Sequence, residues 1–250
     1  MNMSVNLVLL LVLILLFWFF QKKRGLLTLI TLGINLAMLF FMILGFNLGF
    51  SPIILTVITS ILISANNLFN INGFNPSTKS AFLSSTFIIL LMVFPIFFTT
   101  SLLHLQGIPL EGLMEMDMYS LHIGISFVDL SVSVLLMTVI GAINDIAISI
   151  TSSMIEIKEQ LPDLSLSEWK SSGLTVGKDV LGPTINTLIF AAIGSQFALL
   201  IWVFDLNYSL TQLVNSKLIV TEWVAIIFSG ISIAITIPIT IFLLIKQVKN

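Results

Sequence analysis

The stretch that decides the fold is Gly141-Ala-Ile-Asn-Asp145-Ile-Ala-Ile-Ser-Ile-Thr-Ser-Ser153, which places one carboxylate inside a long apolar helix. The chain has 250 residues, of which 57% are hydrophobic and only 9% are charged. This composition excludes a soluble domain and predicts an all-α bundle of membrane helices. A carboxylate in hydrocarbon costs about 2.5–3.5 kcal/mol on insertion scales, so Asp145 is expected to face the bundle interior and to have a function there.

Outward from this stretch, the chain forms a single integral membrane domain, 1–250. A helix needs about 20 apolar residues to cross a bilayer, and seven segments approach or exceed that length. The third has the shortest apolar core, because it opens with Ser51-Pro52 and ends in Asn66-Asn67. The seven predicted spans are 4–20, 26–46, 51–69, 81–102, 129–150, 184–204 and 220–245.

Charge sets the direction of these spans. If every segment crosses, nine of the ten Lys and Arg residues fall on one side and only Lys217 falls on the other. Cytoplasmic loops carry an excess of these residues, so we predict an outside N-terminus and a cytoplasmic C-terminus. The net charge of −2, without a basic patch, argues against nucleic acid as a partner. The lipid bilayer is the expected partner instead. The chain has no cysteine, which excludes disulfides and thiol chemistry.

Residues 151–183 are the largest connection outside the spans and are predicted to form a cytoplasmic amphipathic connector. Ser165-Leu-Ser-Glu168 resembles a capping box and predicts a short helix that ends near Gly173 or Gly177. Trp169 is expected to face lipid or the helix bundle. The connector either couples the fifth span to the sixth or is a passive link, and the sequence leaves both interpretations open.

The fifth span carries a polar stripe. Helical geometry places several small or polar residues within about 40° of Asp145 on the helix surface. They are Ser131, Thr138, Gly141, Ser149, Ser152 and Glu156. The opposite side is apolar and carries Val132, Leu136, Ile143, Ala147 and Ile150. The stripe, with Asn144 beside it, either lines a proton or ion route or lets helices approach closely, as small residues do in membranes.

Other polar residues are secondary candidates. The sixth span shows a similar face that begins with Thr184 and Thr187, and Asn186 is a further buried-polar candidate. The seventh span carries a ladder of hydroxyl residues, and Pro238 should kink this span. The hydroxyl ladder consists of Ser229, Ser232, Thr236 and Thr240. Small faces on the last three spans predict that they pack as one unit.

Two acids near the outer ends of spans have a simpler explanation. We interpret Asp129 as an N-cap and Glu222 as an acid in the first turn of the last span.

Signatures of enzymes are missing from the sequence. It contains no H-E-x-x-H, G-x-S-x-G or Walker motif. Asp129 and Asp145 share one helix about 24 Å apart, so they cannot form the carboxylate dyad of an intramembrane protease. We therefore expect a protein that is not an enzyme and has no cofactor or metal.

The chain resembles the YibE/F family of bacterial multipass membrane proteins. The resemblance rests on the stretch 141–153, on Ser172-Gly173, on the run from Gly177 to Leu188, and on Glu222, Gly230 and Ile237-Pro-Ile-Thr240. Gly73-Phe-Asn75 with Lys79 and Ala81 also fits, whereas Pro183-Thr-Ile185 replaces the usual Thr-Met pair. The short length resembles the YibF-type subunit. The resemblance implies a complex with a longer YibE-like subunit in the bacterial inner membrane.

Two hypotheses about function follow. The first is a transport-related subunit that is proton-coupled through Asp145. The second, from a different class, is a structural or regulatory partner that stabilises a larger membrane subunit and transports nothing itself.

Overall fold

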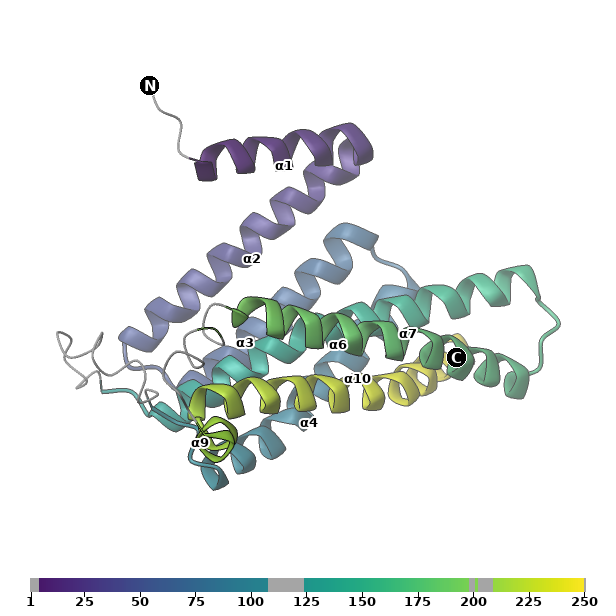
Figure 1. Ribbon diagram of the computed structural model, residues 1–250. Helices are drawn as coiled ribbons and strands as arrows, with labels where there is room; N and C mark the ends of the chain where they lie inside the picture. The colour runs from purple at the N-terminus through teal and green to yellow at the C-terminus, as the bar shows by residue number, and fades with distance from the viewer. Residues whose placement is uncertain (1–4, 108–123, 198–200, 202–208, 250) are drawn as a thin grey trace.

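The computed structural model describes residues 5–107, 124–197, 201 and 209–249, and these residues form helices and their connections with no strand among them. The all-α prediction is therefore confirmed for this part of the chain. Figure 1 shows the helices in chain order. They are α1 (Val5–Gln21), α2 (Lys23–Asn47), α3 (Pro52–Ala65), the π-helix η1 (Asn66–Asn70), α4 (Pro76–Leu102), α6 (Phe127–Gln160), α7 (Leu166–Ser195), α9 (Leu210–Asn215) and α10 (Lys217–Lys249).

The core of the molecule lies where α4, α6 and α10 pack against one another along their length. Ile88 and Met92 of α4 meet the apolar side of α6 and Phe228 of α10 in one buried cluster. A second cluster joins α6, α7 and α10 around Trp169. The α3 helix covers α4 and α6, α2 covers α3 and η1, and α1 packs against α2 at the edge of the bundle.

Five helices are long and apolar enough to cross a membrane: Lys23–Asn47, Pro52–Asn70, Pro76–Leu102, Phe127–Gln160 and Ile219–Val248. A shorter apolar helix covers Leu7–Gln21. These correspond to six of the seven predicted spans, including the segment 51–69, which η1 extends to 19 residues. Part of the predicted span 184–204 lies outside the described residues. The count of seven and the direction of crossing stay predictions.

The connector differs from the prediction in one respect. The capping box is present, because the Ser165 side chain accepts from the Glu168 backbone N–H and the Glu168 side chain accepts from the backbone N–H of Ser165. The helix that it opens does not end near Gly173 or Gly177, however, but continues as α7 to Ser195. That prediction was wrong because these glycines allow close helix contact. A Cβ at Gly177 would lie 2.4 Å from Cγ2 of Ile237 in α10.

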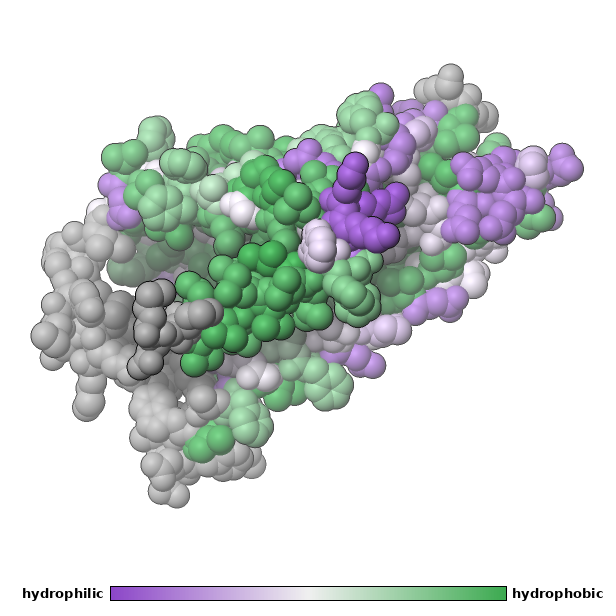
Figure 2. Space-filling view, turned by 90° about the horizontal axis from the view of Figure 1, so that it is seen from above, coloured by the Kyte–Doolittle hydropathy of each residue, from purple (hydrophilic) through white to green (hydrophobic). Residues whose placement is uncertain are grey.

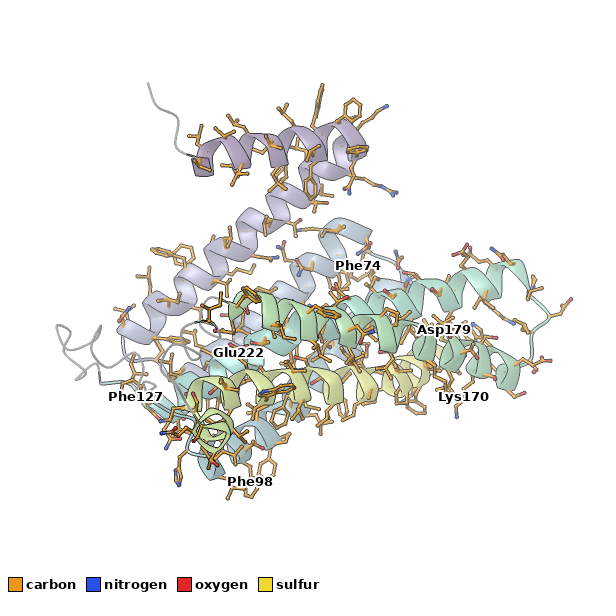
Figure 3. All side chains as sticks on the ribbon, in the orientation of Figure 1. Phe74, Phe98, Phe127, Lys170, Asp179 and Glu222 are labelled. Atoms are coloured by element: carbon orange, nitrogen blue, oxygen red, sulfur yellow. The ribbon has the colours of Figure 1, made fainter. Side chains whose placement is uncertain are left out.

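Polar residues gather at one end of the bundle. Figure 2 shows a hydrophilic surface where α6 turns into α7, a second hydrophilic patch near the middle of this face, and apolar surface beside that patch. Lys170 and Asp179 lie toward this end, whereas Phe127 and Glu222 lie toward the opposite end (Figure 3). A helix bundle with a polar end and a largely apolar surface fits a multipass membrane protein.

Candidate functional site

The polar stripe of α6 points away from the core of the bundle. The apolar side of the helix is buried, as Val132, Leu136, Ile143, Ala147 and Ile150 show. On the stripe, Thr138, Gly141, Asp145, Ser152 and Glu156 are exposed, and Ser131 and Ser149 are partly buried. The expectation that Asp145 faces the bundle interior was therefore wrong. The physical reason is that an unpaired charge costs several kcal/mol in an apolar core, so the apolar side of α6 takes that place.

Asp145 instead lines a cleft between α2, η1 and α6. The cleft has a volume of about 420 Å³, which falls within the range of about 300–1,000 Å³ that small-molecule sites occupy. Gly141 keeps one wall open, because nothing lies within 4 Å of the place that a Cβ would take. The polar side chains that line the cleft come from all three helical segments and the turn that follows η1. They are Thr28, Thr31, Asn35, Asn67, Asn72, Asn144 and Asp145.

A network of asparagine amides closes the inner side of the cleft. Nδ2 of Asn66 donates to the backbone oxygen of Thr31 at 3.1 Å and to Oδ1 of Asn35 at 2.7 Å. Nδ2 of Asn35 in turn donates to Oδ1 of Asn67 at 2.6 Å. Such amide bonds tie membrane helices together, typically at about 0.6–2 kcal/mol each. They hold α2 against η1, and π-helical turns of this kind occur frequently at functional sites.

Two buried polar side chains of the cleft have no hydrogen-bond partner within the described part of the chain. Asn144 is 3% exposed, and neither its amide nitrogen nor its amide oxygen is paired. Thr31 is 1% exposed, and its hydroxyl is also unpaired. A buried polar group without a partner costs about 1–3 kcal/mol, so this hydrogen-bonding capacity calls for a ligand or water.

Farther along α6, the stripe turns into a packing surface. Oγ of Ser77, at the start of α4, donates to Oγ1 of Thr151 at 2.8 Å and lies 3.2 Å from Oγ of Ser152. The hydroxyl ladder of α10 packs in the same way, since Oγ1 of Thr240 donates to Oγ of Ser84 at 2.9 Å. Ser152 thus joins α6 to α4, as the packing interpretation predicts.

The candidate residues of α7 are not brought to Asp145 by any described contact. The hydroxyls of Thr184 and Thr187 donate to carbonyls four residues earlier in their own helix, at 2.8 and 2.9 Å. Asn186 and Thr187 are exposed, and so are Ala191 and Gly194. Close packing of α7 uses Gly173 and Gly177 instead. The last three spans do pack together, because α6, α7 and α10 contact one another and share a buried cluster, but the small face of α7 that begins with Thr184 and Thr187 does not make these contacts.

The secondary candidates have structural positions. Asp129 is not the N-cap of α6; Ser126 is, and its hydroxyl accepts from the backbone N–H of Asp129 at 3.3 Å. Glu222 is not in the first turn of α10, because that helix begins earlier, at Lys217. Its Oε1 accepts from Nε2 of Gln196 at 2.8 Å and so links α10 to the end of α7. Pro238 lies inside α10, which continues past it.

Sequence reasoning missed the asparagine side of the cleft. Asn66 and Asn67 were interpreted as the end of a span, although the sequence between 66 and 75 contains five asparagines in an otherwise apolar chain. That density of amides was the available signal. Thr31 and Asn35 gave no signal, because only the packing of α2 against η1 brings them to the site.

Residues 9–250 match the family model described as YibE/F-like protein. This match covers nearly the whole chain and includes all three walls of the cleft. A search among curated proteins and a search among solved structures return no significant match.

Proposed function

The chain belongs to the YibE/F family, and on that premise we propose that it is a transport-related subunit of a YibE/YibF-like complex, proton-coupled through Asp145. The complex would reside in the bacterial inner membrane, and this subunit would catalyse no covalent reaction. The observation that carries the proposal is an exposed carboxylate part-way along a helix that is long and apolar enough to cross a membrane, beside a cleft with unsatisfied polar groups.

Exposure of Asp145 has a physical consequence in a membrane. Charge that faces lipid is costly, so intramembrane carboxylates pair with a partner or line water-filled routes. The groups beside Asp145 in the cleft are amides and hydroxyls, which can hydrogen-bond both the charged and the protonated carboxyl. A larger subunit that covers this face would enclose the cleft, and a route for protons would then run between the two chains.

Proton flux through the reconstituted complex tests the proposal. The chain and its YibE-like partner would be co-purified and placed in liposomes that contain a pH-sensitive dye, and a pH gradient would be imposed. Asp145→Asn should leave the complex assembled but abolish the dye response. Asp163→Asn, in the exposed turn between α6 and α7, is the matched control and should respond as wild type. Full flux through Asp145→Asn would refute proton coupling at this residue.

We further propose seven spans, with the N-terminus outside and the C-terminus in the cytoplasm. The support is the nine-to-one distribution of Lys and Arg together with the polar end at the turn from α6 to α7. The native chain has no cysteine, so single cysteines report cleanly. In intact cells, an impermeant thiol reagent should label Ser209→Cys and spare Ser167→Cys. The opposite labelling pattern would invert the orientation.

A structural partner is the second candidate function. It is favoured by the exposed small residues of α7, including Ala191 and Gly194, because small residues let another helix approach closely. In this case the chain would stabilise the larger subunit and transport nothing. If the larger subunit, stabilised without this chain, transported by itself, the structural role would be supported over the first proposal.

A further inference from the structure

We propose that the cleft between α2, η1 and α6 binds a small monovalent cation, with Asp145 as its charged ligand and Asn144 and Thr31 as neutral oxygen ligands. This inference extends the proposed function, because it gives the same carboxylate a second ligand besides the proton. It can fail while proton coupling stands, since binding and proton flux are measured separately.

The charge of the cleft sets the charge of its ligand. Asp145 is the only ionisable side chain among the residues that line it. A monovalent cation neutralises one carboxylate, whereas a divalent ion would leave a net positive charge at membrane depth, where charge is costly. An anion would meet the carboxylate without a cationic group to offset it. The lining therefore favours a single positive charge.

The chemistry of the lining favours a cation with a shell of oxygen ligands. Carboxylate, amide carbonyl and hydroxyl oxygens are the ligands that hard cations prefer, and all three kinds line the cleft. With about 420 Å³, the cleft has room for the ion and several waters. Water can bridge the ion to side chains that do not reach it directly and can accept from the Asn144 amide nitrogen.

Helix packing does not explain the two residues on which the proposal depends. Asn35, Asn66 and Asn67 pair with one another, so their hydrogen bonds serve to join α2 to η1. Asn144 and the hydroxyl of Thr31 are buried and unpaired on the opposite walls of the same cleft. A proton on Asp145 alone would leave both unsatisfied, because it requires only the carboxylate. A cation coordinated in the cleft would give both of these side chains a partner.

Binding of ²²Na⁺ to the full chain in detergent tests the proposal, with N-methylglucamine chloride holding the ionic strength constant. We expect one saturable site per chain. Unlabelled Na⁺, K⁺ and methylammonium compete in separate arms, which distinguish a metal cation from an ammonium group. Asp145→Asn should abolish binding, and Asn144→Leu and Thr31→Val should each weaken it at least tenfold.

Matched controls separate ligand loss from misfolding. Asn215→Leu and Thr175→Val remove an exposed amide and an exposed hydroxyl elsewhere and should bind as wild type. The unfolding temperatures of Asn144→Leu and Thr31→Val without the cation should not fall, because each removes unpaired buried polar atoms. Absence of saturable ²²Na⁺ binding, with no rise in the unfolding temperature on addition of K⁺ or methylammonium, would overturn the proposal, and so would wild-type affinity in Asn144→Leu and Thr31→Val. If Asp145→Asn lost proton flux but the wild-type chain bound no cation, the proposal of proton coupling would stand and the proposal of a cation site would fail.

Discussion

Replacing Gly177 by alanine should destabilise the contact between α7 and α10. Gly177 is buried, and a Cβ added there would lie 2.4 Å from Cγ2 of Ile237. Ile237 is β-branched and therefore stiff at χ1, so it cannot simply rotate away. Either the isoleucine leaves its preferred rotamer or the two helices move apart.

The expected loss of unfolding free energy in Gly177→Ala follows from a comparison with Gly230. Alanine at Gly230 of α10 would lie 3.9 Å from Cδ1 of Ile185 in α7, an ordinary contact between the same two helices. Both replacements gain helix propensity of up to about 1 kcal/mol, so this gain cancels in the comparison. The remaining difference is the overpacking at Gly177, about 1–3 kcal/mol. We expect Gly177→Ala to be less stable than Gly230→Ala by that amount.

Unfolding by sodium dodecyl sulfate in mixed micelles, followed by circular dichroism, measures this difference in free energy. The double variant Gly177→Ala with Ile237→Ala adds a direct check, because removal of Cγ2 relieves the contact. In the Ile237→Ala background, Gly177→Ala should cost at least about 0.5 kcal/mol less than in wild type. Equal stability of Gly177→Ala and Gly230→Ala would refute the reasoning, since the close contact would then have no energetic effect.

Two further predictions concern the turn from α6 to α7. Nε1 of the buried Trp169 donates to the backbone oxygen of Met154 at 2.7 Å, so Trp169→Phe should cost about 1 kcal/mol of unfolding free energy and Trp169→Ala about 3–5 kcal/mol in the same assay. Hydrogen bonds from the Ser165 hydroxyl and then from its backbone N–H hold the pKa of the Glu168 carboxyl below its usual value. Because the folded-state pKa is lowered, this contact stabilises the turn above pH about 4.5 and is lost as the pH falls further. Amide protection at the start of α7, measured relative to the intrinsic exchange rate at each pH, should therefore fall on acidification in wild type, and Glu168→Gln should lack this step.

The sequence was a good guide to local structure. Periodicity separated the apolar and polar sides of α6 correctly, and Ser165 and Glu168 marked the start of α7 because a capping box satisfies local backbone groups. It was a poor guide to what each side contacts. Helical periodicity does not say which face of α6 contacts α4. For this reason Asp145 was expected to face the interior of the bundle.

The glycines of α7 and the asparagines of the cleft show the same limit. A glycine near a predicted helix end can terminate the helix or admit a neighbour, and only the position of Ile237 decides between them. Asn144 is separated from Thr31 and Asn67 by long stretches of chain, and the cleft exists only once α2, η1 and α6 have packed. Tertiary contacts between distant segments carry this information, and a local pattern does not.

The hydroxyl contacts between α4 and α10 impose an order on biosynthesis. Ser84 and Thr240 are separated by 156 residues, and Ser80 and Gln247, which also bond, by 167. At about 5–20 residues per second, a ribosome adds that much chain in about 8–33 s. During this interval, Ser80 and Ser84 cannot make these two contacts, because the end of α10 has not yet been synthesised. The core formed by α4, α6 and α10 can therefore be completed only after almost the whole chain has been made.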